Sequence, residues 1–341
     1  MGRYLMAAGM LCLSAGVAYG DDGRTLTDRL HRAASSSSLD DISLKPWHLK
    51  LSFQLFDSKG HPTEQGTIEE WWKSPALHKT VYTSPSYTST EIQTQDGLFR
   101  SKGSSSAPYL LDLVLQQIVH PMPEEKDITN AKPDMRKETI SKLPMDCIML
   151  SQEIKRVPYS PLGLFPTYCF DHDADTLRIS YDFGSQMTVL NRIGSFQQHH
   201  VAIDQTISVN DVTVVTGHIN VLQGIMLQEA DFVPSADLEK AGLDPLKVSS
   251  GVIGGLAVSQ PKPVYPESAR VGHVSGTVML GAIIGRDGRV HSLKLLTTPD
   301  PDLAIAAIAA VRQWRYKPYL FQGEPTEVQT RITVNFSFGP R

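Results

Sequence analysis

The stretch VQTRITVNFSF, residues 328–338, alternates strictly between two kinds of side chain and has the longest uninterrupted period of two in the chain. Successive side chains of a β-strand point to opposite faces of a sheet, so this period predicts a strand with one buried face. A register slip of one residue would expose the whole apolar set, which fixes the pairing. The set on one face is Val328, Thr330, Ile332, Val334, Phe336 and Phe338, and the other set is Gln329, Arg331, Thr333, Asn335 and Ser337.

An apolar helix is predicted just upstream of this strand. Asp300 is placed as its N-cap, Pro301 at its first position and Asp302 in its first turn, so three separate start signals agree. Lys317 and Pro318 are predicted to end it, because proline cannot continue a helix. The small alanines let the helix approach a sheet closely. The face predicted to be buried carries Ala304, Ala307, Ile308, Val311 and Trp314, with Trp314 as a large apolar plug.

A hairpin precedes the helix. Residues 278–284 alternate as a strand, Arg286 to Gly288 form a turn, and residues 290–296 return. Two strands, a helix and a final strand predict a small α+β domain over residues 264–341. A segment rich in glycine, serine and proline, residues 246–263, is predicted to be a linker.

This ordered set of motifs resembles the C-terminal domain of the TonB family over about residues 260–338. The resemblance implies a domain that binds, without catalysis, a short extended segment of an outer-membrane receptor. The segment adds a strand to a sheet edge through main-chain hydrogen bonds. The motifs are Tyr265-Pro266, Ala269, Gly272, Gly276-x-Val278, Asp287-Gly288-x-Val290, Trp314-Arg315-Tyr316-x-Pro318, Gly323-x-Pro325 and the alternating last strand.

Carried over residue by residue, the resemblance implies a role in transmembrane transport with the last strand as the partner-binding edge. The alternative for the same residues is an ordinary amphipathic strand, closed off by a second copy of the chain in a homodimer. The candidate partner-binding residues are Gln260 and Pro261 as rim contacts, with Val328, Gln329, Thr330, Arg331, Ile332, Thr333, Val334, Asn335 and Phe336 on the strand.

Two features of a TonB energy transducer are missing from this sequence. Such a protein has an uncleaved membrane helix that carries a functional histidine, and a long spacer rich in proline and lysine connects this helix to the C-terminal domain. Here no histidine lies between Leu5 and Ala18, and the prolines of residues 21–262 are scattered through a predicted folded domain. We therefore expect an adaptor without coupling to the proton gradient.

The larger part of the chain, residues 46–245, is predicted to be an antiparallel β domain, preceded by a polar lead with a short helix over residues 21–45. WHLKLSFQLFD, residues 47–57, alternates as a half-buried strand, and similar short strands follow. The one clear interruption is a helix with apolar residues at helical spacing between Leu110 and Ile118. Residues 124–142 are predicted to be a polar connection, and residues 236–241 a short helix capped by Ser235.

Residues 39–228 also resemble, more weakly, the half-barrel of LolA-type periplasmic lipoprotein carriers. The likeness lies in a Gly-x-hydrophobic-x-x-Trp strand from Gly66 to Trp71 and in the Asp96-Gly97 turn before a buried helix. It implies an alternative function as a carrier of a lipid or acyl chain, with the C-terminal domain as a docking module. Adjacent Trp71 and Trp72 must face opposite sides, so one is expected in the core while the other is free to line a lipid groove.

The first twenty residues read as a secretory signal peptide. An apolar run from Leu5 to Ala18 precedes a small-residue cleavage site, and it is shorter than a bilayer-spanning helix needs. We expect the mature protein in the periplasm, the alternative being an uncleaved anchor in the inner membrane. In that oxidising compartment Cys147 and Cys169 either form a disulfide or remain two separate buried thiols.

Composition and motif content exclude several classes. A formal net charge of -4 and 20% charged residues give no basic surface for nucleic acid. Adjacent His199 and His200 point to opposite faces of a strand and cannot chelate one metal together. No nucleophile elbow, zinc motif or phosphate-binding loop occurs. We therefore predict neither an enzyme nor a cofactor or metal, and an enzyme ranks third after the binding protein and the carrier.

Overall fold

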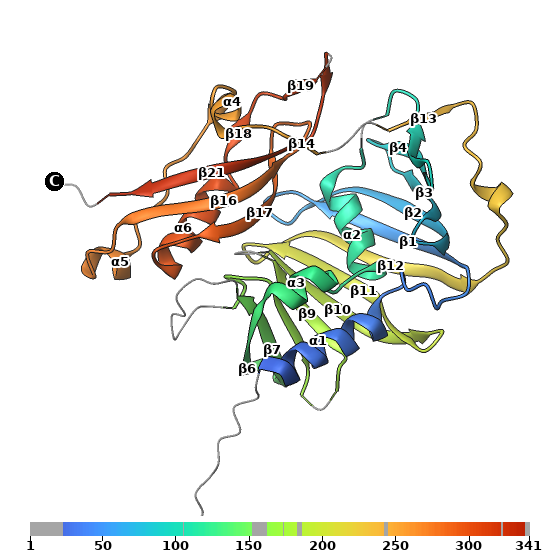
Figure 1. Ribbon diagram of the computed structural model, residues 1–341, viewed down its shortest axis with the longest axis horizontal. Helices are drawn as coiled ribbons and strands as arrows, with labels where there is room; N and C mark the ends of the chain where they lie inside the picture. The colour runs from blue at the N-terminus through green and yellow to red at the C-terminus, as the bar shows by residue number, and fades with distance from the viewer. Residues whose placement is uncertain are drawn as a thin grey trace, which may run out of the picture.

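The structure, a computed structural model, describes residues 23–104, 106–151, 162–172, 174–182, 186–241, 245–321 and 323–337. The predicted signal peptide and Phe338 lie outside these residues. A large domain with one curved sheet and a small domain with its own sheet lie side by side (Figure 1). A search of the described helices finds none with the length and apolar character needed to cross a bilayer.

The large domain is built from short antiparallel strands and a few helices. The helices are α1 (Gly23–Ser37), α2 (Tyr109–Val119), α3 (Glu125–Asn130) and a 3₁₀ turn, η1 (Glu229–Phe232). The strands are β1 (Trp47–Phe56), β2 (Pro62–Ser74), β3 (Leu77–Thr83), β4 (Thr88–Thr94), β5 (Gly97–Ser101), β6 (Lys132–Ile140), β7 (Leu143–Ser151), β8 (Thr167–Asp171), β9 (Leu177–Asp182), β10 (Gln186–Phe196), β11 (His199–Val209), β12 (Val212–Gly224) and β13 (Leu238–Lys240).

Within the described residues these thirteen strands form one sheet, in the order β13-β5-β4-β3-β2-β1-β12-β11-β10-β9-β8-β7-β6. Neighbours are antiparallel and mostly sequential, as expected for a meander, and the chain closes back on itself where β1 pairs with β12. The helices α1, α2 and α3 lie against one face, called the helix-covered face below (Figure 1). The predicted antiparallel β domain with a packing helix is confirmed.

The helix α2 is held to the sheet by the apolar residues that its sequence pattern predicted. Leu111, Val114, Leu115 and Ile118 are buried in one cluster with alternate residues of β1. Gly217 of β12 allows the close approach, because a Cβ atom there would lie 2.8 Å from Val114 Cγ2. The helix therefore presses directly on the sheet backbone at this point.

The polar connection predicted over residues 124–142 is wrong, because this segment contains α3 and the strand β6. β6 pairs with β7 through a two-residue turn in which Ser141 and Lys142 have φ angles of 51° and 68°. Hairpin turns of this left-handed kind usually carry Asn-Gly or Asp-Gly, so Ser-Lys gave no sequence signal. The short helix predicted over residues 236–241 is also absent, since the strand β13 lies there against β5.

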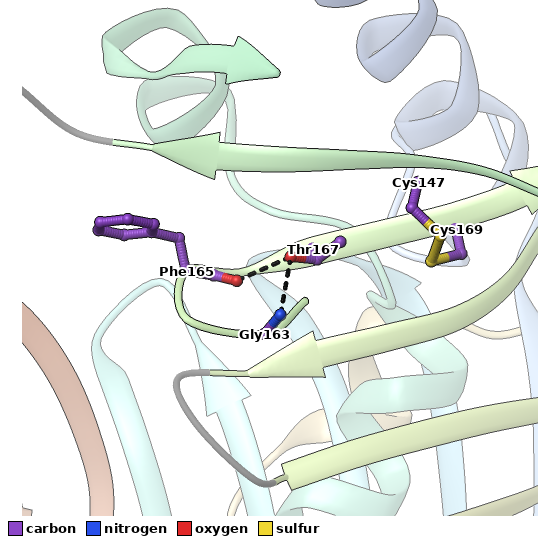
Figure 2. Close-up of a disulfide and its surroundings, with 5 residues drawn as sticks. All are labelled: Cys147, Gly163, Phe165, Thr167 and Cys169. Carbon is purple, nitrogen blue, oxygen red and sulfur yellow. Dashed lines mark hydrogen bonds between the residues drawn. A yellow bond between two sulfur atoms is a disulfide. The ribbon is translucent and has the colours of Figure 1, made fainter. Parts of the chain in front are cut away.

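Cys147 and Cys169 form a disulfide (Figure 2). They lie directly opposite each other on the neighbouring strands β7 and β8, and both are fully buried. Close to the bridge, Thr167 Oγ1 donates to the carbonyl of Phe165 (2.9 Å) and accepts from the amide of Gly163 (3.3 Å). These bonds fix the turn before β8 and the direction of the Phe165 side chain (Figure 2).

The small domain is a four-stranded sheet in the order β14-β21-β16-β17, with one long helix packed on it. Its elements are β14 (Leu246–Lys247), α4 (Ser250–Gly254), β15 (Ala257–Ser259), α5 (Glu267–Val271), β16 (Gly276–Ile284), β17 (Val290–Thr297), α6 (Pro301–Val311), β18 (Arg315–Tyr316), β19 (Leu320–Phe321), β20 (Glu324–Pro325) and β21 (Val328–Phe336).

Two details of the small domain differ from expectation. The segment 246–263, predicted to be a linker, contributes β14, α4 and β15 to this domain. The helix α6 starts at the predicted cap, where Asp300 accepts hydrogen bonds from the amides of Asp302 and Leu303. It ends at Val311 instead of reaching Lys317, so the half-buried Trp314 follows the helix and is no plug on its face.

The two domains share a hydrophobic core. Met149, Leu164 and Phe165 of the large domain belong to the same buried cluster as Leu303 and Val311 of α6. Burial of a phenylalanine side chain is worth several kcal/mol, so this contact fixes one domain against the other. The disulfide and the Thr167 hydrogen bonds hold the turn that supplies it.

We predict that Phe165→Ala lowers the free energy of unfolding by about 3 kcal/mol, because it empties a closed site between the domains. Denaturant unfolding followed by tryptophan fluorescence measures this loss. Phe321→Ala is the matched control, since Phe321 is 48% exposed and its truncation should cost less than about 0.5 kcal/mol. Equal losses in the two variants would contradict the shared core.

Candidate functional site: the edge of β21 and the helix-covered face

The strand β21 follows the sequence pattern residue by residue. Its nine residues alternate between buried and exposed from Val328 to Phe336, as predicted. All nine pair in register with β16, from Ile284 opposite Val328 to Gly276 opposite Phe336. The buried side chains are Val328, Thr330, Ile332, Val334 and Phe336, and the exposed ones are Gln329, Arg331, Thr333 and Asn335.

The other side of β21 is only partly covered. β14 runs parallel to its first two residues, and the amides of Leu246 and Val248 donate to the carbonyls of Glu327 and Gln329, each at 2.9 Å. Beyond Gln329 no described strand pairs with this side of β21. The final strand is therefore an inner strand at its start and an edge strand over its last seven residues.

The geometry of a β-strand assigns the free backbone groups to particular residues. The N–H and C=O of one residue point to the same side, and successive residues alternate. The carbonyls of Glu327 and Gln329 face β14. By this alternation the backbone groups of Arg331, Thr333 and Asn335 point to the same side, where β14 no longer pairs with the strand. Thr330 and its even-numbered neighbours therefore use their backbone groups to pair with β16.

Side-chain contacts fix the far end of this edge. Thr277 Oγ1 donates to Asn335 Oδ1 at 2.9 Å across the β16–β21 pair. Phe336 packs edge-on against Tyr265, with ring centroids 5.6 Å apart. The Tyr265 hydroxyl in turn donates to the carbonyl of Val274. These contacts hold the edge straight without using its outward backbone groups.

The two predicted rim residues, Gln260 and Pro261, are exposed and also form hydrogen bonds within the small domain. Gln260 Nε2 donates to the hydroxyl of Tyr316 at 3.5 Å, and the carbonyl of Pro261 accepts from Trp314 Nε1 at 3.0 Å. These bonds join the segment after β15 to the segment around β18. Tyr316 belongs to the same cluster as Val328, so Gln260 and Pro261 lie toward the covered start of β21 and away from its free part.

His291 connects the small domain to α2 through ring stacking and is itself held by two acidic residues of the small domain. His291 of β17 stacks on Tyr109 with ring centroids 5.4 Å apart, and its Nε2 lies 3.1 Å from Asp287. Its Nδ1 lies 3.9 Å from Glu327, immediately before β21. Burial works against protonation of His291, but the hydrogen bond to Asp287 and the charge of Glu327 outweigh it and raise the pKa to about 9. His291 is therefore charged at neutral pH.

The helix-covered face of β2 to β5 carries a row of polar residues that sequence reasoning missed. Glu70, Thr80, Glu91 and Arg100 lie directly opposite one another on four successive strands. Arg100 Nε donates to Glu91. Glu70 is 5% exposed, and its Oε2 has no hydrogen-bond partner among the described residues. Glu70 lies two residues from each of the core residues Ile68 and Trp72, so the period of two in β2 already indicated that Glu70 faces the core.

Burial raises the pKa values of acidic groups in and beside this row. Burial, assisted by the charges of Asp40 and Asp112, raises the pKa of Glu70 to about 8. Burial and the charge of Glu91 raise the pKa of Asp112 on α2 to about 6. Glu70 is therefore mostly protonated at neutral pH, since its ionised form lacks a compensating partner.

A cavity of about 300 Å³ lies between the large domain and β17. Polar side chains on both domains line it, including Gln117, Tyr168, Ser180, Gln186 and Lys294. Ser180 Oγ donates to Gln117 Oε1, and the Tyr109 hydroxyl donates to Gln186 Oε1, each at 3.0 Å. Lys294 Nζ lies 3.8 Å from Asp127 of α3. The polar groups lining the cavity are thus largely satisfied within the protein.

The two adjacent tryptophans face opposite sides, as predicted. Trp72 is buried, stacks on Trp47 at 5.6 Å and donates to Asp40. Trp71 lies on the outer face against His48 and Lys79. Over the residues that the structure describes, no three His, Cys, Asp or Glu side chains are grouped as they would be to hold a metal ion.

Comparison with known proteins supports the resemblance of the small domain. Residues 261–338 match the family model for the Gram-negative bacterial TonB protein C-terminal domain, which confirms the predicted likeness. Protein TonB of Vibrio cholerae is 29% identical over 82 residues, which are 24% of this chain and 34% of that protein. The chain thus spans about a third of the length of the curated relative it matches.

Solved structures similar to the chain include members of the LolA group. A LolA superfamily protein from Nitrosomonas europaea has a TM-score of 0.42 at 9% identity and covers 60% of this chain and 97% of its own. A domain described as an outer membrane lipoprotein-sorting protein, from Vibrio parahaemolyticus, has a TM-score of 0.41 at 9% identity and covers 60% and 95%.

We predict that Glu70→Gln stabilises the protein above pH 8, by on the order of 4 kcal/mol. The folded pKa of Glu70 is raised from 4.5 to about 8, so its ionisation makes the native state less stable as pH rises through this range. Thermal unfolding between pH 5 and pH 9 should show a decline that the variant lacks.

Glu69→Gln is the matched control on the opposite face of β2. Hydrogen bonds from Lys50 and His48 overcome partial burial and lower the pKa of Glu69, so its loss should slightly destabilise the protein at neutral pH. A parallel pH response in wild type and Glu70→Gln would show that Glu70 does not ionise with this cost.

Proposed function

We propose that this protein is an exported, periplasmic binding protein of the TonB class, which recruits a segment of an outer-membrane receptor by strand addition to β21 and takes part in transmembrane transport. The observation that carries this proposal is the free edge from Thr330 to Phe336, with outward backbone groups at Arg331, Thr333 and Asn335. An unpaired strand edge offers a row of donors and acceptors to another chain.

The family match supports this function for the small domain. The match covers residues 261–338, so it includes all of β16, β17, α6 and β21. The domain acts by binding in this proposal, and no bond is made or broken.

The same edge has a second possible occupant, another copy of the chain. A homodimer would pair two β21 edges about a twofold axis and satisfy the same backbone groups. It would also block the receptor segment, so the two occupants compete. The experiment below separates them by the dependence of protection on protein concentration.

The carrier alternative fits the structure less well. An acyl chain needs an apolar cavity, whereas the lining of the cavity beside β17 includes three charged residues, Asp127, Asp182 and Lys294, and several hydrogen-bonded polar groups. The helix-covered face of β2 to β5 carries the buried polar row from Glu70 to Arg100. Mass spectrometry of the purified protein under native conditions distinguishes the two functions, since bound lipid would favour the carrier.

Amide hydrogen exchange tests strand addition residue by residue. We predict that peptides from the periplasmic N-terminal segments of the host's outer-membrane receptors slow exchange at Arg331, Thr333 and Asn335 by at least ten-fold. The amides of Thr330, Ile332 and Val334 should change little, because they already pair with β16. Protection that grows with protein concentration in the absence of peptide would indicate the homodimer instead.

Thr333→Pro provides the matching variant. Proline removes one outward donor while leaving the β16 ladder intact, so peptide affinity should fall by at least ten-fold. Thr333→Val keeps the amide and should bind as wild type. Thr330→Pro is unsuitable, since the Thr330 amide faces β16 and its loss would damage the fold. Unchanged peptide binding by Thr333→Pro would refute strand addition.

A further inference from the structure

A groove of about 770 Å³ runs over the exposed face of the small sheet, beside β21. Its charged lining residues are Lys247, Lys294 and Arg331, from three different strands, and none of its described lining residues is Asp or Glu. The chain as a whole has a formal net charge of -4, so this local surplus of positive charge runs against the composition. The groove is lined further by Val248, Ser249, Ser250, Gly281, Ala282, Ile283, Ser292, Leu296, Gln329 and Thr330.

Two of the three positive residues, Arg331 and Lys294, lie in one row across the sheet. The third, Lys247, lies on β14 opposite Gln329. Arg331 lies directly opposite Gly281 on β16, and Gly281 lies directly opposite Lys294 on β17. Gly281 has no side chain to fill the space between the two cations. A Cβ atom at this position would meet the Leu296 side chain at 3.7 Å and Lys294 Cβ at 3.8 Å, both ordinary contacts, so packing does not require glycine. The position between Arg331 and Lys294 is therefore a hollow in the floor of the groove, bordered by Leu296.

The charge of this groove is only partly balanced within the protein. Lys294 has one acidic neighbour, Asp127 of α3, at 3.8 Å. Lys247 and Arg331 are exposed and form no ion pair with any described residue. A groove lined by one sign of charge concentrates the field at its centre and favours an anionic ligand.

The groove is continuous with the free edge of β21. The backbone of Arg331 faces that edge, while its side chain lies in the groove. A strand added to the edge would place the residue opposite Arg331 on the same face, with Cβ atoms about 5 Å apart. A side chain at that position of the added strand would enter the groove.

We propose that the groove selects partner segments that carry an aspartate or glutamate opposite Arg331. This inference rests on the proposed strand addition and names the chemistry of its partner: an extended, acidic polypeptide segment. Lys247 and Lys294 line the same groove and add to its preference for a carboxylate.

Selection from a library of random eight-residue displayed peptides tests this on the full chain. Wild type should enrich peptides with Asp or Glu, Arg331→Glu should lose that enrichment, and Thr333→Pro should enrich nothing. If wild type enriched peptides that Thr333→Pro does not bind, but these peptides showed no preference for Asp or Glu, the proposed role of the groove would be wrong and strand addition would stand. Failure of wild type to enrich any peptide beyond Thr333→Pro would overturn both.

A selected acidic peptide then measures the contact itself. Replacing its Glu by Gln should weaken binding to wild type about five-fold, the size of one exposed ion pair. Arg331→Gln should bind both peptides equally, whereas Lys59→Gln, the same charge change on a distant turn, should keep the five-fold difference. The difference should shrink in 0.5 M salt. A preference that survives Arg331→Gln would contradict the assignment.

Discussion

The pairing of β21 with β16 is the constraint on which the small domain depends. One strand has to bury five side chains, three of them in the same cluster as α6, keep its backbone in register along nine residue pairs, and still present unpaired groups on its other side. The period of two in a strand makes these demands compatible, because side chains and backbone groups alternate independently between two directions. A shift of one residue would exchange the buried and exposed sets, and the core and the edge would be lost together.

The sequence alone was sufficient where local chemistry determines structure. The strict alternation of residues 328–336 and the cap at Asp300 both predicted elements that the structure contains. Prediction from the sequence failed where an element is determined by contacts with residues far away in the chain. β6 and β7 turn on Ser141 and Lys142, whose left-handed backbone is imposed by strand pairing and leaves no glycine as a signal. Two-residue β14 is a strand only because β21 lies beside it.

In the candidate site, too, features set by the local sequence were predictable and features set by distant strands were not. Period two predicted which side chains of β21 are exposed, yet its free backbone groups follow from the short length of β14, which no local pattern reports. The role of Gln260 and Pro261 as rim contacts stays a prediction, and no sequence pattern indicated their hydrogen bonds to Tyr316 and Trp314. The row from Glu70 to Arg100 joins four strands in space, so it is visible only once the register is known.

The disulfide between Cys147 and Cys169 has a mechanical consequence. Phe165, just before β8, shares its hydrophobic cluster with α6 and β21, so a force on the last strand would reach the large domain at this contact. Noncovalent strand pairs separate easily when their ends are peeled apart. Here the two strands that receive the load are joined by a covalent bond in their buried middle, so peeling stops at the bridge. The disulfide thereby stiffens the part of the large domain that contacts the small domain.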